Sequence, residues 1–189
     1  VTFTAANWDT PQTVTVTGED DDLVDGTITS TITIAVDDAN SDDDFDAVTD
    51  QTLSVDTLDD DVAGFTIEET EGATEVDESG STDTFTIVLD AQPTNDVVVL
   101  ATASNDETEA IVSGSITFTS ENWDTPQTVT VTGVDDDLVD GDQTYDITIS
   151  IVDTISDDDF DGVADQSVSS TTLDNDAPGF TIEETDAAT

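Results

Sequence analysis

The sequence contains no lysine, arginine or histidine, although 48 of its 189 residues are aspartate or glutamate. Its formal net charge is therefore -48, and no two side chains can form a salt bridge. Binding to phosphate requires cationic side chains, so nucleic acid is excluded as a partner, and an anionic lipid surface would repel the chain. The charge must be offset by cations from solution, and carboxylate oxygens are hard ligands suited to Ca²⁺ or Mg²⁺.

Cysteine is also absent, which removes disulfides, thiolate metal sites and cysteine nucleophiles. No hydrophobic run approaches the length of a membrane span, so we expect no direct membrane insertion. The opening residues VTFTAANW have the pattern of a strand and not of a signal peptide. Strong acidity with only 5% aromatic residues is typical of a disordered chain. Short alternating runs of Val, Ile, Leu, Phe and Thr nevertheless predict half-buried strands.

Two stretches occur twice at the same spacing. NWDTPQTVTVTG begins at Asn7 and Asn122, and GFTIEET begins at Gly64 and Gly179, so both offsets are 115 residues (122 − 7 and 179 − 64). An unchanged offset indicates tandem duplication of one structural unit. We predict that residues 1–63 are the C-terminal part of a repeat, residues 64–178 are one complete repeat, and residues 179–189 are the first strand of the next. On this interpretation the chain is a window on a longer array.

The complete repeat contains seven segments in which apolar and polar residues alternate, which predicts an all-β fold: an antiparallel, immunoglobulin-like β-sandwich. Threonine-rich outer faces favour strand over helix because β-branched side chains fit a pleated surface. We expect Phe65, Phe118, Trp123 and Phe180 to anchor the core. The predicted strands cover residues 65–68, 84–89, 97–102, 115–119, 128–132, 145–151 and 167–173.

Acidic residues gather in the loops at the ends of the predicted strands, and each cluster recurs one period away. The clusters of the complete repeat contain Asp135, Asp136, Asp137, Asp140 and Asp142, followed by Asp174 and Asp176. Their counterparts in the first copy are Asp20, Asp21, Asp22 and Asp25, followed by Asp59, Asp60 and Asp61. A solvated acidic loop that keeps the protein soluble is the alternative interpretation. Because several clusters meet at one end of the predicted sandwich and the chain supplies no cation, we predict that these residues bind Ca²⁺.

Two motifs resemble a known family. DDDVAGFTIEE at residues 59–69 is similar to the junction between Calx-β domains of sodium/calcium exchangers and large bacterial surface proteins, and VTVTGVDDDLVDGD at residues 129–142 resembles that family's strand and acidic loop. The resemblance covers the complete repeat and both partial ones. It implies calcium at one end of the sandwich, with Ca²⁺ ligands at Glu68, Asp106, Asp135, Asp136, Asp137, Asp140, Asp174 and Asp176.

A separate stretch has the D-x-D-x-D-G spacing of a calcium loop, in which alternate carboxylates converge while glycine permits a sharp turn. It lacks the terminal bidentate glutamate, because Val168 stands at the twelfth position, and Ala47 replaces the glycine in the first copy. The residues of this second predicted calcium site are Asp157, Asp159, Asp161, Gly162 and Asp165.

We therefore expect a calcium-binding structural repeat that forms a rigid rod, stalk or filament with neighbouring repeats of the same chain in a secreted or cell-surface protein. Paired carboxylates can hydrolyse glycosides. An enzyme is disfavoured, however, because the acidic groups recur with the repeat and the chain has no His, Lys, Cys or Arg. Two alternatives stay open: a calcium-dependent adhesive module that binds glycan or another surface, and self-assembly into filaments through edge strands.

Overall fold

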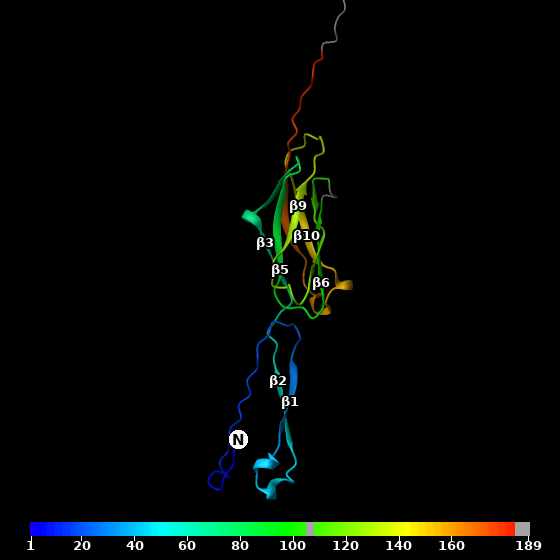
Figure 1. Ribbon diagram of the computed structural model, residues 1–189. Coiled ribbons are helices and arrows are strands. Elements are labelled where there is room, and N and C mark those ends of the chain that lie inside the picture. The colour runs from blue at the N-terminus through cyan, green and yellow to red at the C-terminus, as the bar shows by residue number, and fades with distance from the viewer. Residues whose placement is uncertain (105–107, 184–189) are drawn as a thin grey trace, which may run out of the picture. The chain divides into compact units, whose positions relative to one another are not determined.

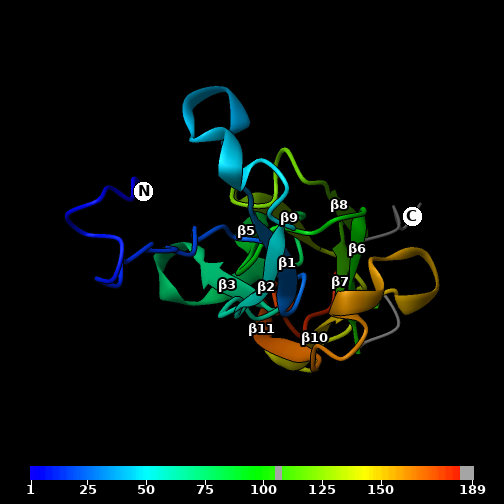
Figure 2. The same ribbon diagram turned by 90° about the horizontal axis from the view of Figure 1, so that it is seen from below.

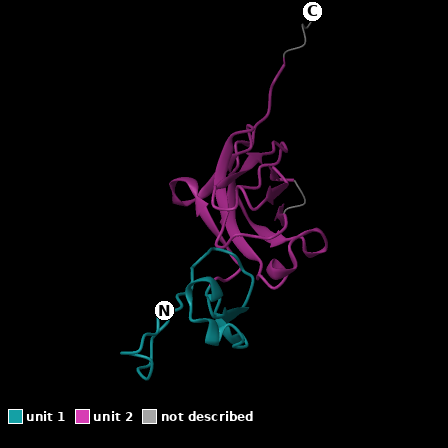
Figure 3. Ribbon diagram, turned by 60° about the horizontal axis from the view of Figure 1, so that its bottom comes forward, with its two compact units in different colours: residues 1–60 teal, residues 61–189 magenta. Residues whose placement is uncertain are grey.

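A computed structural model describes residues 1–104 and 108–183. The chain divides into two compact units, residues 1–60 and residues 61–189 (Figure 3). The division falls close to the predicted start of the complete repeat at Gly64. Each unit has its own sheets, and no sheet is shared between the two in the described part of the chain.

The second unit is an immunoglobulin-like β-sandwich of two facing sheets (Figure 1 and Figure 2). One sheet has the strand order β4-β11-β10-β6-β8 and the other has the order β3-β5-β9-β7. All neighbouring strands are antiparallel except β4 and β11, which run parallel. The strands are β3 (Phe65–Glu69), β4 (Thr74–Asp77), β5 (Thr82–Leu89), β6 (Val97–Ala103), β7 (Ala110–Val112), β8 (Ser115–Phe118), β9 (Gln127–Gly133), β10 (Gln143–Ile151) and β11 (Gln166–Leu173).

The core lies between the two sheets and follows the predicted alternation. Phe85 and Ile87 of β5 are fully buried, as are Val129 and Val131 of β9 and two isoleucines of β10, Ile147 and Ile149. Apolar side chains at every second position of β5, β9 and β10 point to one face of the strand and are buried, while the polar residues between them are exposed or half-buried. Burial of this apolar face stabilises the sandwich.

The predicted core anchors are confirmed in part. Phe65 and Phe118 are buried, and Trp123 is half-buried against the core. Phe180 is 89% exposed, so its assignment to the core is wrong. Its segment, residues 179–183, pairs with no strand, whereas the identical residues at 64–68 include most of β3 and pair with β5.

Seven strands were predicted, and the second unit has nine among its described residues. The two additional strands, β4 and β7, are short and lie at sheet edges. Their sequences, TEVD and AIV, are too short to display an alternating pattern. They form because longer neighbours supply the hydrogen-bonding partners, β11 for β4 and β9 for β7.

The first unit contains one hairpin, in which β1 (Ile28–Ile34) pairs with β2 (Gln51–Thr57). The hairpin has the same register as β10 and β11, which stand 115 residues later in the chain. Ile34 faces Gln51 in the hairpin, and Ile149 faces Gln166 in the sandwich. The described helices are all short 3-10 turns, and none is long and apolar enough to cross a membrane. They are η1 (Asp38–Asn40), η2 (Asp43–Phe45), η3 (Thr70–Gly72), η4 (Asp153–Ile155) and η5 (Asp158–Phe160).

Candidate metal centre

Three segments distant in sequence meet at one end of the second unit: the residues after β4, the loop between β9 and β10, and the residues after β11. The parallel pairing of β4 with β11 brings the ends of these two strands together, and the Glu78 N–H donates to the Leu173 carbonyl at 3.2 Å. A Cβ at Gly133 would overlap the main chain of Asp77. Glycine at the end of β9 therefore allows the acidic loop to start directly beside β4.

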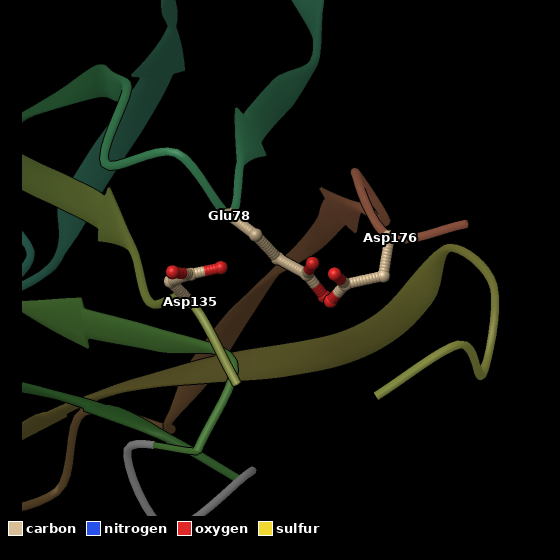
Figure 4. A group of neighbouring side chains, drawn as sticks. All are labelled: Glu78, Asp135 and Asp176. Carbon is tan, nitrogen blue, oxygen red and sulfur yellow. The ribbon is translucent and has the colours of Figure 1, made fainter. Parts of the chain in front are cut away.

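The first acidic group consists of Glu78, Asp135 and Asp176, one residue from each segment (Figure 4). Each contributes one carboxylate oxygen, and the three oxygens all lie within 4.8 Å of one another. Figure 4 shows the Glu78 and Asp176 carboxylates side by side, with the Asp135 carboxylate turned toward them. The group therefore joins residues from both halves of the repeat.

Glu78 is the buried member of this group, with only 1% of its surface exposed. Its Oε2 accepts a hydrogen bond from the Asn175 N–H at 3.2 Å, and its Oε1 has no donor in the described part of the chain. The Asn175 hydrogen bond lowers the pKa of Glu78, but burial and the negative charges of Asp174, Asp136 and Asp176 outweigh it. The pKa of Glu78 is therefore raised, because its charged form lacks a compensating cation.

The second acidic group consists of Glu109, Asp136 and Asp140, whose ligand oxygens also lie within 4.8 Å of one another. Glu109 stands directly before β7, and the other two belong to the loop after β9. Burial raises the pKa of Glu109, and the charges of Asp136 and Asp140 raise it further. Its Oε2 is buried, and no described residue donates to it. Because Glu78 also raises the pKa of Glu109, the two groups interact electrostatically.

Asp176, like Glu78 and Glu109, has a raised pKa and a buried carboxylate oxygen without a donor among the described residues. Burial raises its pKa, and the charges of Asp135 and Asp137 add to the effect. Its Oδ2 is buried and has no hydrogen-bond partner among the described residues. A buried carboxylate oxygen without a donor is costly unless a cation or a proton compensates it. Each group thus contains at least one such oxygen.

Other predicted ligands hold the loops in place through hydrogen bonds. The Asp174 carboxylate accepts from the Gly141 N–H and the Asp176 N–H, each at 2.7 Å, and Asp142 accepts from the Asp174 N–H at 3.2 Å. Asp137 adopts a positive φ of 63°, which aspartate tolerates better than most residues. These contacts position the acidic loop so that its remaining carboxylates face one another.

Among the described ligands implied by the family resemblance, Glu68, Asp137 and Asp174 belong to neither group. Glu68 is exposed, because it alternates with Phe65 and Ile67, which face the core side of β3. Asp106 lies outside the described residues. Glu78 and Glu109 were not predicted as ligands, because each adjoins one of the short strands that the pattern did not reveal. The turn sequence DESG after residue 76 was the available signal for Glu78.

The predicted calcium loop at residues 157–165 has a different local structure. Asp157 is 3% exposed, and its Oδ2 accepts from the Thr94 hydroxyl at 2.8 Å and from the Asn95 N–H at 2.6 Å. Its Oδ1 caps η5 by accepting from the Asp159 N–H at 3.2 Å. Burial raises the pKa of Asp157, but these hydrogen bonds outweigh it and lower the pKa overall. Asp157 therefore joins two loops.

The other carboxylates of this loop lie outside the two acidic groups. Asp159 and Asp165 are exposed. Burial and the charges of Asp153 and Asp158 raise the pKa of Asp161. Metal binding by Asp157, Asp159, Asp161 and Asp165 stays a prediction.

In the first unit, the clusters keep two of the hydrogen bonds of the second. Asp21 accepts from the Leu23 N–H at 3.0 Å, as Asp136 accepts from the Leu138 N–H at 2.8 Å. Asp59 accepts from the Gly26 N–H at 2.7 Å and from the Asp25 N–H at 3.1 Å. Neither acidic group includes a described carboxylate from the first copy. The first-copy residues that stay predicted ligands without such a group are Asp20, Asp21, Asp22, Asp25, Asp59, Asp60 and Asp61.

The sequence matches no protein-family model and no curated protein. Among solved structures it is similar to the E. coli chaperone DraB, with a TM-score of 0.41 and 10% identity over 62% of this chain and 59% of that one. An apo-form Calx CBD1 domain has a TM-score of 0.39 and 15% identity over 59% of this chain and 98% of the domain. Domains 4 and 5 of the S-layer protein SbsC have a TM-score of 0.37 and 19% identity, over 66% of this chain and 63% of that one. The chain thus spans less than two thirds of DraB.

Proposed function

We propose that this protein is a calcium-binding structural module of an extracellular or cell-surface protein, in which Ca²⁺ at the acidic end of the sandwich offsets the buried carboxylates. Glu78 carries this proposal. Its side chain is 1% exposed, one of its oxygens lacks a donor in the described chain, and two further carboxylates face it. No lysine, arginine or histidine exists in the sequence to neutralise it.

The geometry of the two acidic groups fits calcium. Oxygens that ligate one Ca²⁺ at about 2.4 Å lie at most about 4.8 Å apart. The three oxygens of each group satisfy that limit, since all lie within 4.8 Å of one another. Calcium accepts six to eight oxygens in flexible geometry, so water and main-chain carbonyls can complete its shell, whereas magnesium requires a near-ideal octahedron. We therefore expect calcium to be preferred over magnesium.

The ion would stabilise the fold by joining segments that are far apart in the chain. Glu78 and Asp176 come from opposite ends of the complete repeat, and Asp135 comes from its middle. Extracellular calcium modules bind with dissociation constants of about 10⁻⁴ to 10⁻³ M. At a free calcium concentration of one hundred times that constant, each site would stabilise the folded state by about 2.7 kcal/mol.

A spacer or rod is the role that follows for such a module. Only Ala177 and Pro178 separate Asp176 from Gly179, where the next copy of the repeated sequence begins. An ion bound at Asp176 would restrict this short connection and so limit the motion between successive copies. A catalytic role is not proposed, because the acidic clusters recur with the repeat and the sequence lacks the usual nucleophiles and bases.

The test is thermal unfolding of the whole chain with calcium, with magnesium and with excess chelator, at fixed ionic strength. In a Trp8→Phe background, Trp123 reports on the second unit alone, because these are the only two tryptophans. We expect calcium to raise the unfolding midpoint by roughly 10 °C or more over the chelated protein, and magnesium to raise it much less.

Two matched variants separate the site from general screening of charge. Glu78→Gln should remove about half or more of the calcium-induced rise, because it breaks one of the two groups. Glu75→Gln removes the same charge from an exposed position on β4 and should leave the rise unchanged. Equal, weak effects of calcium and magnesium, or equal effects of the two variants, would show that the carboxylates only solubilise the surface.

A further inference from the structure

The first unit exposes apolar side chains whose counterparts are buried one period later. Phe45 is 57% exposed, whereas Phe160 is fully buried. Val16 is 50% exposed, whereas Val131 is fully buried. Leu53 of β2 is also exposed, whereas its counterpart Val168 of β11 is buried. The first unit thus presents an apolar surface of the kind that forms the core of the second.

The second unit shows what covers this surface. Its β10 pairs with β6 along one edge, and its β11 pairs with β4 along the other. Its β9 lies between β5 and β7. The strands β4, β5, β6 and β7, which flank β9, β10 and β11, all lie within residues 64–115. This is the first half of the complete repeat, and the position that corresponds to Val1 comes directly after it. The β1–β2 hairpin has the register of β10 and β11 but pairs with no third strand in the described chain.

Residues 12–18 indicate independently that strands from residues 64–115 are needed for the second half of the repeat to fold as it does in the sandwich. Their sequence QTVTVTG is identical to that of β9, yet they form no strand. In the second unit, β9 is held by hydrogen bonds from β5 on one side and β7 on the other. The difference between the two copies is therefore the presence of these neighbours.

We propose that residues 1–60 form an acceptor surface for a half-repeat, a polypeptide with the sequence pattern of residues 64–115. It would place counterparts of β4 and β6 on the two edges of the β1–β2 hairpin and counterparts of β5 and β7 beside residues 12–18. Residues 179–183 of a second copy of this chain correspond to residues 64–68, which include most of β3 but no part of β4, β5, β6 or β7.

The half-repeat would also complete a metal site, a step that rests on the proposed function. Each acidic group of the second unit takes one glutamate from the first half of the repeat and two aspartates from the second half. Residues 1–60 have the aspartates Asp20, Asp21 and Asp25 at the positions that match Asp135, Asp136 and Asp140. The half-repeat would supply the counterparts of Glu78 and Glu109.

The experiment places residues 64–115 in front of Val1 in the full-length chain, with Trp123→Phe so that Trp8 is the only tryptophan. Trp8 is 71% exposed in the first unit. We expect its emission to shift to shorter wavelength, and amide exchange in β1 and β2 to slow by about a hundredfold or more. A matched extension carrying Val97→Asp and Val99→Asp in the added half should produce neither change, because both valines are core residues of β6.

Unchanged Trp8 emission and unchanged exchange in β1 and β2 with the native extension would overturn the acceptor surface. Calcium stoichiometry separates this result from the proposed function. With Glu78→Gln and Glu109→Gln in the added half alone, the surface should still be covered while the number of bound calcium ions stays that of the original chain. If the native extension covers the surface without increasing the bound calcium, the docking stands and the metal site of the first copy fails.

Discussion

Residues 7–18 and residues 122–133 have the same twelve amino acids but not the same structure. In the second unit the segment contains β9, and Val129 and Val131 are fully buried. In the first unit the corresponding residues form no strand, and Val14 is 61% exposed. An isolated strand has no partner for its N–H and C=O groups and no face to bury. Strand propensity is therefore realised only where neighbouring strands are present.

Short-range features, in contrast, are the same in both copies. Asn7 accepts from the Thr4 N–H at 2.5 Å, and Asn122 accepts from the Thr119 N–H at 2.6 Å. The caps of the two acidic loops and the register of the two hairpins also repeat. These features depend on residues a few positions apart or on one hairpin, so they do not require the neighbouring strands that surround β9, β10 and β11.

The largest difference we predict between the two copies is in hydrogen exchange. Amides of residues 128–132 should exchange at least about a thousandfold more slowly than those of residues 13–17, because opening β9 requires unfolding of the sandwich. Exchange measured by NMR or mass spectrometry in calcium tests this. Comparable rates in the two identical segments would contradict the view that neighbouring strands decide the structure.

The next largest difference we predict is in the effect on stability of truncating two corresponding phenylalanines, one in each copy. Phe160→Ala removes a fully buried ring, so it should lower the free energy of unfolding of the second unit by about 3–5 kcal/mol. Phe45→Ala removes an exposed ring at the same place in the repeat and should change the free energy of unfolding of the first unit by less than about 0.5 kcal/mol. Urea unfolding followed through Trp123 in a Trp8→Phe background measures the effect of Phe160→Ala, and unfolding followed through Trp8 in a Trp123→Phe background measures the effect of Phe45→Ala. A small effect of Phe160→Ala would contradict the expected difference between the two copies.

Substitution of Asp157, which caps η5, should also lower the free energy of unfolding more than substitution of Asp42, which caps η2, but by a smaller amount than the phenylalanine changes. Asp157→Asn weakens hydrogen bonds from Thr94 and Asn95 and should cost about 1–3 kcal/mol at neutral pH. Asp42→Asn, its counterpart, affects only a local cap and should cost little. Because the pKa of Asp157 is lowered in the folded state, its contribution is present above the unfolded pKa and is lost as pH falls through the folded pKa. The two variants should therefore differ at pH 7 and converge in strong acid.

The smallest effect we predict is a pH dependence of the calcium-free protein. The pKa of Glu78 is raised in the folded state, so the folded chain holds the proton more tightly than the unfolded chain between the two pKa values. Stability should therefore fall as pH rises through that interval, and Glu78→Gln should flatten this slope while Glu75→Gln should not. Urea midpoints measured in chelator between pH 4 and 7 test the sign; a slope that Glu78→Gln leaves unaltered would show that other carboxylates dominate.

The core could be predicted from the sequence because it depends on alternation within single strands. Ile147 and Ile149 alternate with polar residues, and both are fully buried. The residues of the two acidic groups could be predicted only in part, because alternation does not reveal β4 or β7. The acidic loop at Asp135, Asp136 and Asp140 was found, whereas Glu78 and Glu109 were not.

By itself, the amino-acid sequence determined the 115-residue period, the alternation of the strands, the local caps and the lack of any internal cation. Only the tertiary structure decided which of two identical segments becomes β9, and that Glu78 and not Glu68 lies buried at the acidic end. The physical reason is that caps and alternation act over a few residues, while strand pairing and burial of a carboxylate depend on segments brought together from opposite ends of the repeat.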